Sequence, residues 1–180
     1  MKGKLYVGLA NPSTQAIREM TSKDKKWQMQ SLKKILYLKK ILFSKLDFDY
    51  LIFDTSPGFQ YSSINAIFAS DFSFLISSTE KSDLKGTKIL IEDLYKHFNK
   101  ESEIILNKFP GLFYNTKNPK KFSEFFEKPV NMAIPCFCKL LESDSEFFFA
   151  SNYPDHAFSK KLYDLAEKIE NQNVKFNKGS

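Results

Sequence analysis

The chain has 180 residues, 42% of them hydrophobic, so it is long enough for one α/β domain with a buried sheet and does not require a second domain. Its net charge of +6, from 27 Lys and Arg against 21 Asp and Glu, fits weak contact with DNA or acidic lipids through Lys-rich faces, but it also fits simple solubility. No apolar stretch is long enough for a transmembrane segment or a secretory signal, and two cysteines one residue apart fit a reducing compartment, so we expect a cytoplasmic protein.

The first elements predicted along the chain are two short strands and two helices. Lys4 to Ala10 is an apolar run that ends at a proline and reads as a strand. From Asp24 to Leu46 the apolar residues recur on one arc of a helical wheel, which predicts an amphipathic helix. Tyr50 to Phe53 is apolar throughout, as expected of a strand buried on both faces. A helix over Ser62 to Ala69 follows.

Strands and helices also alternate in the second half of the chain. The helix after the first of these strands should be capped by Ser82, and residues 109–121 should form a loop because they are rich in proline, glycine and asparagine. The predicted strands are Phe72 to Ile76, Ile104 to Leu106 and Val130 to Ile134, and the predicted helices start at Ser82, Phe122 and Ala157.

This alternation predicts an α/β fold with three layers, in which helices cover both faces of a mainly parallel sheet. We expect one domain over residues 1–170 and a polar tail over residues 171–180. Ligands of such sheets bind at the carboxyl ends of the strands, so the residues that follow each strand are the candidate site.

Asp54 is the most informative of these residues because it directly follows a strand predicted to be fully buried. A carboxylate at that position can bind a magnesium-coordinated water beside nucleotide phosphates, and Gly58 allows the backbone to approach a terminal phosphate closely. The same residues can also be read as a strand that simply ends in an Asx-type turn.

Four short motifs follow the predicted elements: Asp54-Thr55-Ser56-Pro57-Gly58, Ala69-Ser70-Asp71 before a strand, Ile104-Ile105-Leu106-Asn107-Lys108, and Ala133-Ile134-Pro135. They resemble motifs of the MinD/ParA family of nucleotide-switch ATPases and occur in that family's order.

The resemblance implies binding of ATP and Mg²⁺. Asp54 would be the Walker B residue that holds the magnesium water shell, which makes it the expected catalytic residue, and an amide at Asn107 could offer both a donor and an acceptor to adenine. The other nucleotide-binding residues that it implies are Thr55, Pro57, Gly58, Lys108 and Pro135. A homodimer or a complex with a partner ATPase chain is also implied.

The phosphate-binding loop of that family, Lys-Gly-Gly-x-Gly-Lys-Ser/Thr, does not occur in the chain. Gly3 and Gly8 have the spacing of such a loop, but Leu9 and Ala10 stand where Lys and Ser or Thr are needed. We therefore expect a truncated or loop-less member that has no ATPase activity on its own, because the missing groups neutralise the triphosphate charge. A non-catalytic scaffold that pairs with a complete ATPase is an alternative.

A second alternative is a metal or iron-sulfur carrier. Cys136 and Cys138 could supply two thiolates each from two subunits to one zinc ion or one iron-sulfur cluster. The same cysteines can equally be small residues packed at the end of a strand.

Overall fold

The computed structural model describes residues 3–9, 13, 24–56, 58, 60–110, 118–137 and 149–176. The chain consists of two compact units, unit 1 (Met1–Asp71) and unit 2 (Phe72–Ser180). The single domain expected over residues 1–170 stays a prediction. None of the described helices is both long and apolar enough to cross a membrane.

Unit 2 contains a sheet of three strands, all parallel, in the order β1-β2-β3. Leu75 is paired with Ile104, and Ile105 with Met132. All three strands were predicted, and the longest, β2, extends beyond the predicted strand at both ends. The strands are β1 (Ser73–Ser77), β2 (Ser102–Phe109) and β3 (Val130–Pro135).

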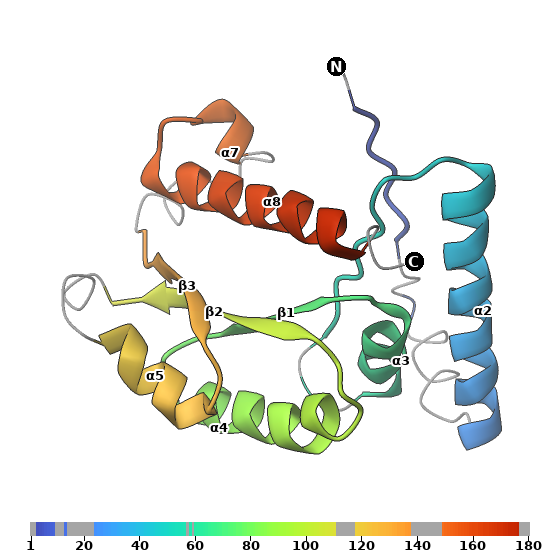
Figure 1. The fold of residues 1–180 in the computed structure, drawn as a ribbon, viewed down its shortest axis with the longest axis horizontal. Coiled ribbons are helices and arrows are strands. Elements are labelled where there is room, and N and C mark those ends of the chain that lie inside the picture. The colour runs from blue at the N-terminus through green and yellow to red at the C-terminus, as the bar shows by residue number, and fades with distance from the viewer. Residues whose placement is uncertain are drawn as a thin grey trace. The chain divides into compact units, whose positions relative to one another are not determined.

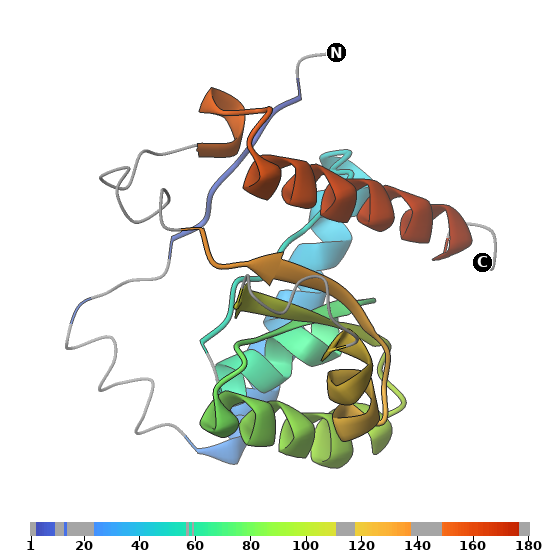
Figure 2. The same ribbon diagram turned by 90° about the vertical axis from the view of Figure 1, so that its left-hand side faces the viewer.

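Helices cover both faces of this sheet, which confirms the predicted three-layer α/β arrangement (Figures 1 and 2). Helix α8 lies on one face, and α4 and α5 lie on the other. Helix α8 also extends into the segment predicted as a polar tail. The helices of unit 2 are α4 (Lys81–Leu90), which continues as the π-helical segment η1 (Ile91–Lys96), α5 (Asn118–Phe126), α7 (Phe149–Asn152) and α8 (Ala157–Phe176).

The core of unit 2 is centred on β2. Ile104, Ile105 and Leu106 are consecutive and all essentially inaccessible to solvent, as expected of a strand with a helix layer on each face. Ile105 belongs to a cluster on the α8 side, where Phe158 and Leu165 of that helix pack. Burying each such side chain contributes about 1.5–3 kcal/mol, so this packing fixes α8 against the sheet.

Charged side chains connect the end of α5 to α4 and η1. The Glu127 carboxylate lies 3.1 Å from the Lys96 ammonium and 3.6 Å from that of Lys88. The hydrogen bond and charge of Lys96, followed by the charge of Lys88, lower the pKa of Glu127. These pairs link the residue after α5 to α4 and η1, but ion pairs so accessible to solvent contribute little to stability.

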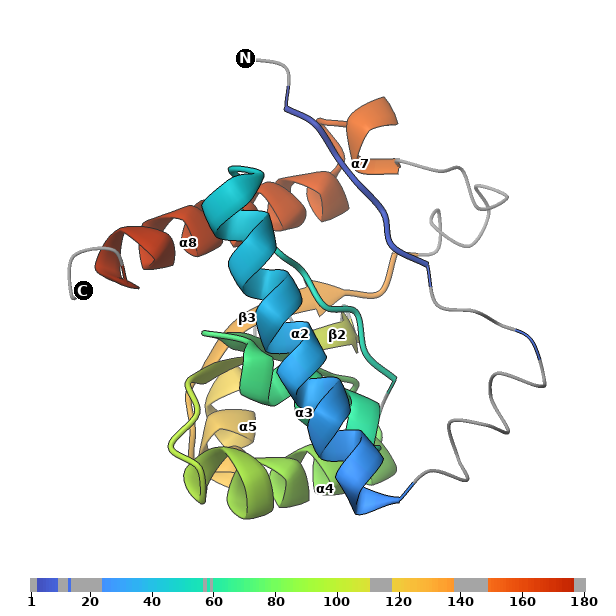
Figure 3. The same ribbon diagram turned by 90° about the vertical axis from the view of Figure 1, so that its right-hand side faces the viewer.

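Unit 1 contains two packed helices, α2 (Lys25–Lys45) and α3 (Tyr61–Ala69), which lie side by side (Figure 3). The Asp24 side chain caps α2 by accepting a hydrogen bond of 2.8 Å from the Trp27 backbone N–H. The buried Asn65 Nδ2 donates to the Gln28 carbonyl at 3.1 Å. Both helices were predicted, and α2 begins one residue after the predicted start at Asp24, which is its N-cap.

The two strands predicted in unit 1 are not formed. Residues 4–9 and Tyr50–Phe53 have no regular secondary structure, and Ala10 lies outside the described residues. A strand needs a neighbour to satisfy its backbone N–H and C=O groups, and neither segment has one among the described residues. Apolar composition alone was therefore not sufficient to make these segments strands.

Candidate nucleotide-binding edge of the sheet

The carboxyl ends of the parallel strands place three candidate segments of unit 2 along one edge. The first segment follows Ser77, the last residue of β1. The second contains Asn107 and Lys108, near the end of β2, and the third begins at Pro135, the last residue of β3. Three of the predicted nucleotide-binding positions, Asn107, Lys108 and Pro135, thus lie on neighbouring strands near the same edge.

Asn107 and Lys108 lie within β2, at an irregularity in its pairing, whereas the predicted strand ended at Leu106. The register with β3 shifts between Leu106 and Phe109, and Lys108 has a positive φ of 52°. The Asn107 Oδ1 accepts a hydrogen bond of 2.9 Å from the Lys108 backbone N–H. A local irregularity of this kind changes the direction of a side chain at the end of a strand and is common beside active sites.

Among the described residues, only one hydrogen bond uses the side-chain amide of Asn107. Its side chain is half-buried, and its Nδ2 group donates to no atom among the described residues. The bond from Lys108 holds Oδ1 in place, while Nδ2 keeps two donor hydrogens and Oδ1 keeps one lone pair. This amide can therefore offer an adjacent donor and acceptor to one planar ligand.

The chain that follows the third strand stays attached to β2. The Cys136 backbone N–H donates to the Phe109 carbonyl at 2.9 Å. The Phe137 ring then lies edge-to-face with the His156 ring at 5.1 Å and with the Phe158 ring at 6.0 Å. These contacts fix the direction in which the chain leaves Pro135.

Ser78 organises the segment after β1. Its Oγ donates to the Asp83 carboxylate at 2.6 Å and accepts from the Glu80 backbone N–H at 3.2 Å. Helix α4 begins at Lys81 with Glu80 at the N-cap, so the predicted cap at Ser82 was wrong. The N-cap thus lies two residues earlier than predicted, and the hydroxyl that orders this helix start comes from Ser78.

The segment from Asp54 to Gly58 belongs to unit 1. Asp54 and Thr55 are exposed and have no regular secondary structure, and Pro57 lies outside the described residues. Gly58 has a φ of 94°, a backbone conformation that favours glycine. The buried Ser63 Oγ donates to the Ser56 carbonyl at 2.9 Å and attaches this segment to the first turn of α3.

Because Asp54 is in unit 1 and Asn107 is in unit 2, the convergence of the carboxylate and the amide on one ligand stays a prediction.

The cysteine pair is only half described. Cys136 is exposed and has a free thiol, whereas Cys138 lies outside the described residues. Within the described part of the chain, no group of three or more His, Cys, Asp or Glu side chains could hold a metal ion. The metal-carrier alternative therefore stays a prediction.

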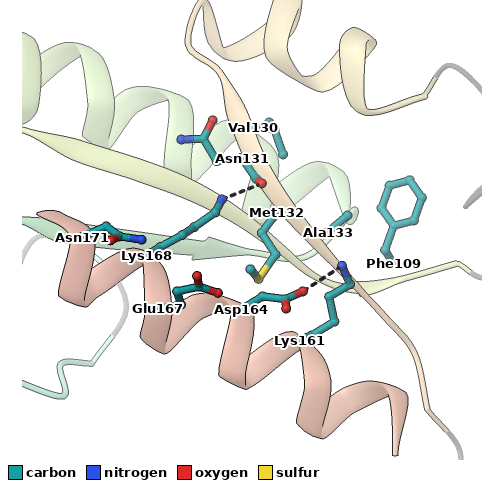
Figure 4. A pocket seen from close by; sticks show the side chains of 10 residues that line it. All are labelled: Phe109, Val130, Asn131, Met132, Ala133, Lys161, Asp164, Glu167, Lys168 and Asn171. Carbon is teal, nitrogen blue, oxygen red and sulfur yellow. Dashed lines mark hydrogen bonds and ion pairs between the residues drawn. The ribbon is translucent and has the colours of Figure 1, made fainter.

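A groove of about 480 Å³ lies between β3 and α8, and it was not found by reasoning from the sequence. Figure 4 shows its charged side: the Lys168 Nζ donates to the Asn131 carbonyl at 3.1 Å, and Lys161 pairs with Asp164 at 3.4 Å. Lys161, Asp164, Lys168 and Asn171 recur every three or four residues, so they share one face of α8. That spacing was the available signal, but only packing of the helix on the sheet shows that the face borders a groove.

Neither a search of protein-family models nor a search of curated proteins finds a match to the sequence. Among solved structures, the fold is similar to that of the cell division ATPase MinD from Pyrococcus furiosus. The TM-score is 0.62 at 23% identity, and the match covers 78% of this chain and 59% of that one.

A second similar structure is the septum site-determining protein MinD from Pyrococcus horikoshii OT3, which was crystallised with Mg-ADP. Its TM-score is 0.61 at 21% identity, with 77% of this chain and 56% of that one covered. The chain thus spans little more than half the length of these two proteins. The order of the four motifs predicted this similarity of fold. The chain has a MinD-like α/β fold.

Proposed function

We propose that the chain is a nucleotide-binding switch module of the MinD/ParA type. The observation that carries this proposal is the Asn107 amide, held by Lys108 near the carboxyl end of β2, beside the end of β3, in a MinD-like fold. In this reading Asn107 contacts adenine, with Lys108 and Pro135 beside it.

Unit 1 would supply the residues that bind phosphate and magnesium. Asp54 would hold the water shell of Mg²⁺, and Thr55, Pro57 and Gly58 would follow the terminal phosphate. Carboxylate and hydroxyl oxygens are the ligands that Mg²⁺ prefers, and the positive φ of Gly58 keeps the backbone free of a side chain where a phosphate would approach. The Mg-ADP complex of the P. horikoshii protein supports this choice of ligand.

The polypeptide on its own should bind nucleotide weakly and should not hydrolyse ATP. Its sequence contains no Lys-Gly-Gly-x-Gly-Lys-Ser/Thr motif, whose amides and lysines would offset the cost of desolvating a triphosphate. Without these amides and lysines, contacts to adenine alone should give only a small free energy of binding.

Thermal unfolding with and without Mg-ATP tests this proposal against P. furiosus MinD as a reference. At millimolar Mg-ATP we expect the melting temperature of this chain to rise by less than about 2 °C, because a ligand near its Kd adds little stability. Phosphate release should stay at the rate of the buffer. A rise as large as that of the reference protein would contradict the argument from the missing loop.

A further inference from the structure

One residue of the candidate site, Lys108, has a backbone conformation that is unusual for a lysine within a strand. Among the described residues, four residues other than glycine have a positive φ, and three of them, Asp47, Asn99 and Glu127, lie shortly after the end of a helix. Left-handed backbone is common at helix ends. Lys108, with a φ of 52°, is the only one of the four that lies within a strand. Steric contact of the Cβ makes this conformation costly for lysine, whereas glycine adopts it freely.

The conformation of Lys108 accompanies a bulge of one residue in β2. Two residues of β2, Asn107 and Lys108, stand opposite a single residue of β3, Ile134. The chain is anchored on both sides of this bulge, because Leu106 and Phe109 are 0% and 1% exposed. Bulges are rare in parallel pairs of strands and are enriched beside active sites. The core of unit 2 thus holds a strained backbone in place near the carboxyl end of the strand.

The bulge determines how the Asn107 amide is held. The backbone N–H of Lys108 donates to the Asn107 Oδ1 at 2.9 Å. In a regular strand this N–H would point sideways, toward a neighbouring strand, and would not reach the preceding side chain. Without the bulge, the amide oxygen of Asn107 would therefore lose its donor, and the side chain would be free to rotate. The left-handed backbone at Lys108 fixes the orientation of this amide.

We propose that Lys108 is a positioning residue for the nucleotide and that it acts through its backbone conformation, not through its ammonium group. This role rests on the proposed function, in which Asn107 contacts adenine. The affinity for nucleotide should then depend on how easily residue 108 adopts a positive φ. Glycine adopts it most easily, alanine resists it, and the β-branched valine resists it most.

Titration of ¹⁵N-labelled variants with Mg-ADP, followed in NMR spectra, tests this dependence. Lys108→Gly, Lys108→Ala and Lys108→Val all lack the ammonium group, so differences among them do not arise from its charge. We expect Lys108→Val to bind Mg-ADP at least about 10-fold more weakly than Lys108→Gly. Lys108→Ala should bind at least about 3-fold more weakly than Lys108→Gly, which keeps the comparison decisive if valine prevents folding.

Two further measurements separate this role from a general effect on the fold. In the free chain, the coupling between the amide and α protons of residue 108 reports φ, which should be positive in the parent and negative in Lys108→Val. The side-chain NH₂ resonances of Asn107 should move in Lys108→Val more than in Lys108→Gly. Asn99 is the matched control, because it is exposed, has a φ of 49° and precedes β2 at the opposite end of the strand. Asn99→Val should melt at a lower temperature than Asn99→Gly, but the two should bind Mg-ADP equally.

Failure of this role is distinguishable from failure of the proposed function. Equal affinities of Lys108→Gly, Lys108→Ala and Lys108→Val, beside a parent that binds Mg-ADP, would overturn the role of Lys108 and leave the proposed function standing. A loss of affinity in Asn99→Val as large as that in Lys108→Val would also overturn it, as would a negative φ at residue 108 in the free parent. A parent chain whose Asn107 resonances do not respond to Mg-ADP would refute the proposed function itself.

Discussion

At the scale of single residues, the contacts of Tyr95 show how a polar group is held in the core of unit 2. Tyr95 is buried in η1, and its hydroxyl forms a hydrogen bond with the Ser73 side chain in β1. Burial raises the pKa of Tyr95 above its ordinary value of 10.0, and the bond to Ser73 offsets part of that shift. The neutral phenol therefore contributes stability that is complete below pH 10 and is lost as the pH rises through the raised pKa.

Tyr95→Phe should change both the size and the pH dependence of stability. At neutral pH the loss of one hydrogen bond should lower the free energy of unfolding by about 1 kcal/mol. Above pH 10 the variant should lose less stability than the parent, because it has no phenol to ionise. Urea titrations at several pH values measure both effects, with the exposed Tyr37→Phe as control. Parallel pH profiles for Tyr95→Phe and the parent would contradict this account.

At the scale of secondary-structure elements, one lysine joins the two helices of unit 1. The Lys39 Nζ, on α2, donates to both carboxylate oxygens of Asp71 at 2.7 Å and to the Ala69 carbonyl at 3.0 Å. Ala69 is the last residue of α3, where a positive charge interacts favourably with the helix dipole. Lys39, a residue of α2, thus caps the carboxyl end of α3.

Lys39→Met should lower the free energy of unfolding by about 0.5–1.5 kcal/mol, because it removes the ion pair and the contact with the end of α3. Part of the effect should decrease at high salt. Lys40→Met, at the neighbouring exposed position, should change stability by less than about 0.5 kcal/mol. Chemical denaturation of both variants, with Asp71→Asn to complete a double-mutant cycle, measures the coupling. Equal effects of the two lysine variants would show that the contacts of Lys39 contribute nothing.

At the scale of the whole molecule, the sequence predicted the elements whose pattern is local. The periodicity of α2 and α8 and the apolar run of β2 were sufficient to locate these elements. For β2 and α8 the pattern reflects a strand or a face packed within unit 2, whereas in α2 the apolar arc includes the exposed Leu36, Leu38 and Phe43. Sequence reasoning failed where structure depends on a neighbour. Tyr50–Phe53 is not a strand without a strand beside it, and Ser82 was taken as a cap because periodicity does not show where the chain turns.

Only the part of the candidate site that is marked by local motifs could be predicted from the sequence. The motif around Asn107 predicted that this residue lies near the carboxyl end of a parallel strand, as it does in β2. The register shift between Leu106 and Phe109 depends on pairing with β3 and could not be predicted from the sequence. The groove beside α8 likewise arises only from packing of that helix on β3. Asp54 and Gly58 are still identified by motif alone.

The central claim, that the carboxyl edge of the sheet receives a nucleotide at Asn107, is tested most directly by titrating the ¹⁵N-labelled chain with Mg-ADP in NMR spectra. We predict that the side-chain NH₂ resonances of Asn107 shift and saturate with a Kd on the order of 1 mM, and that the binding is lost in Asn107→Ala but kept in Asn131→Ala, at the opposite end of β3. Resonances of Asn107 that stay unchanged at millimolar Mg-ADP would contradict the claim.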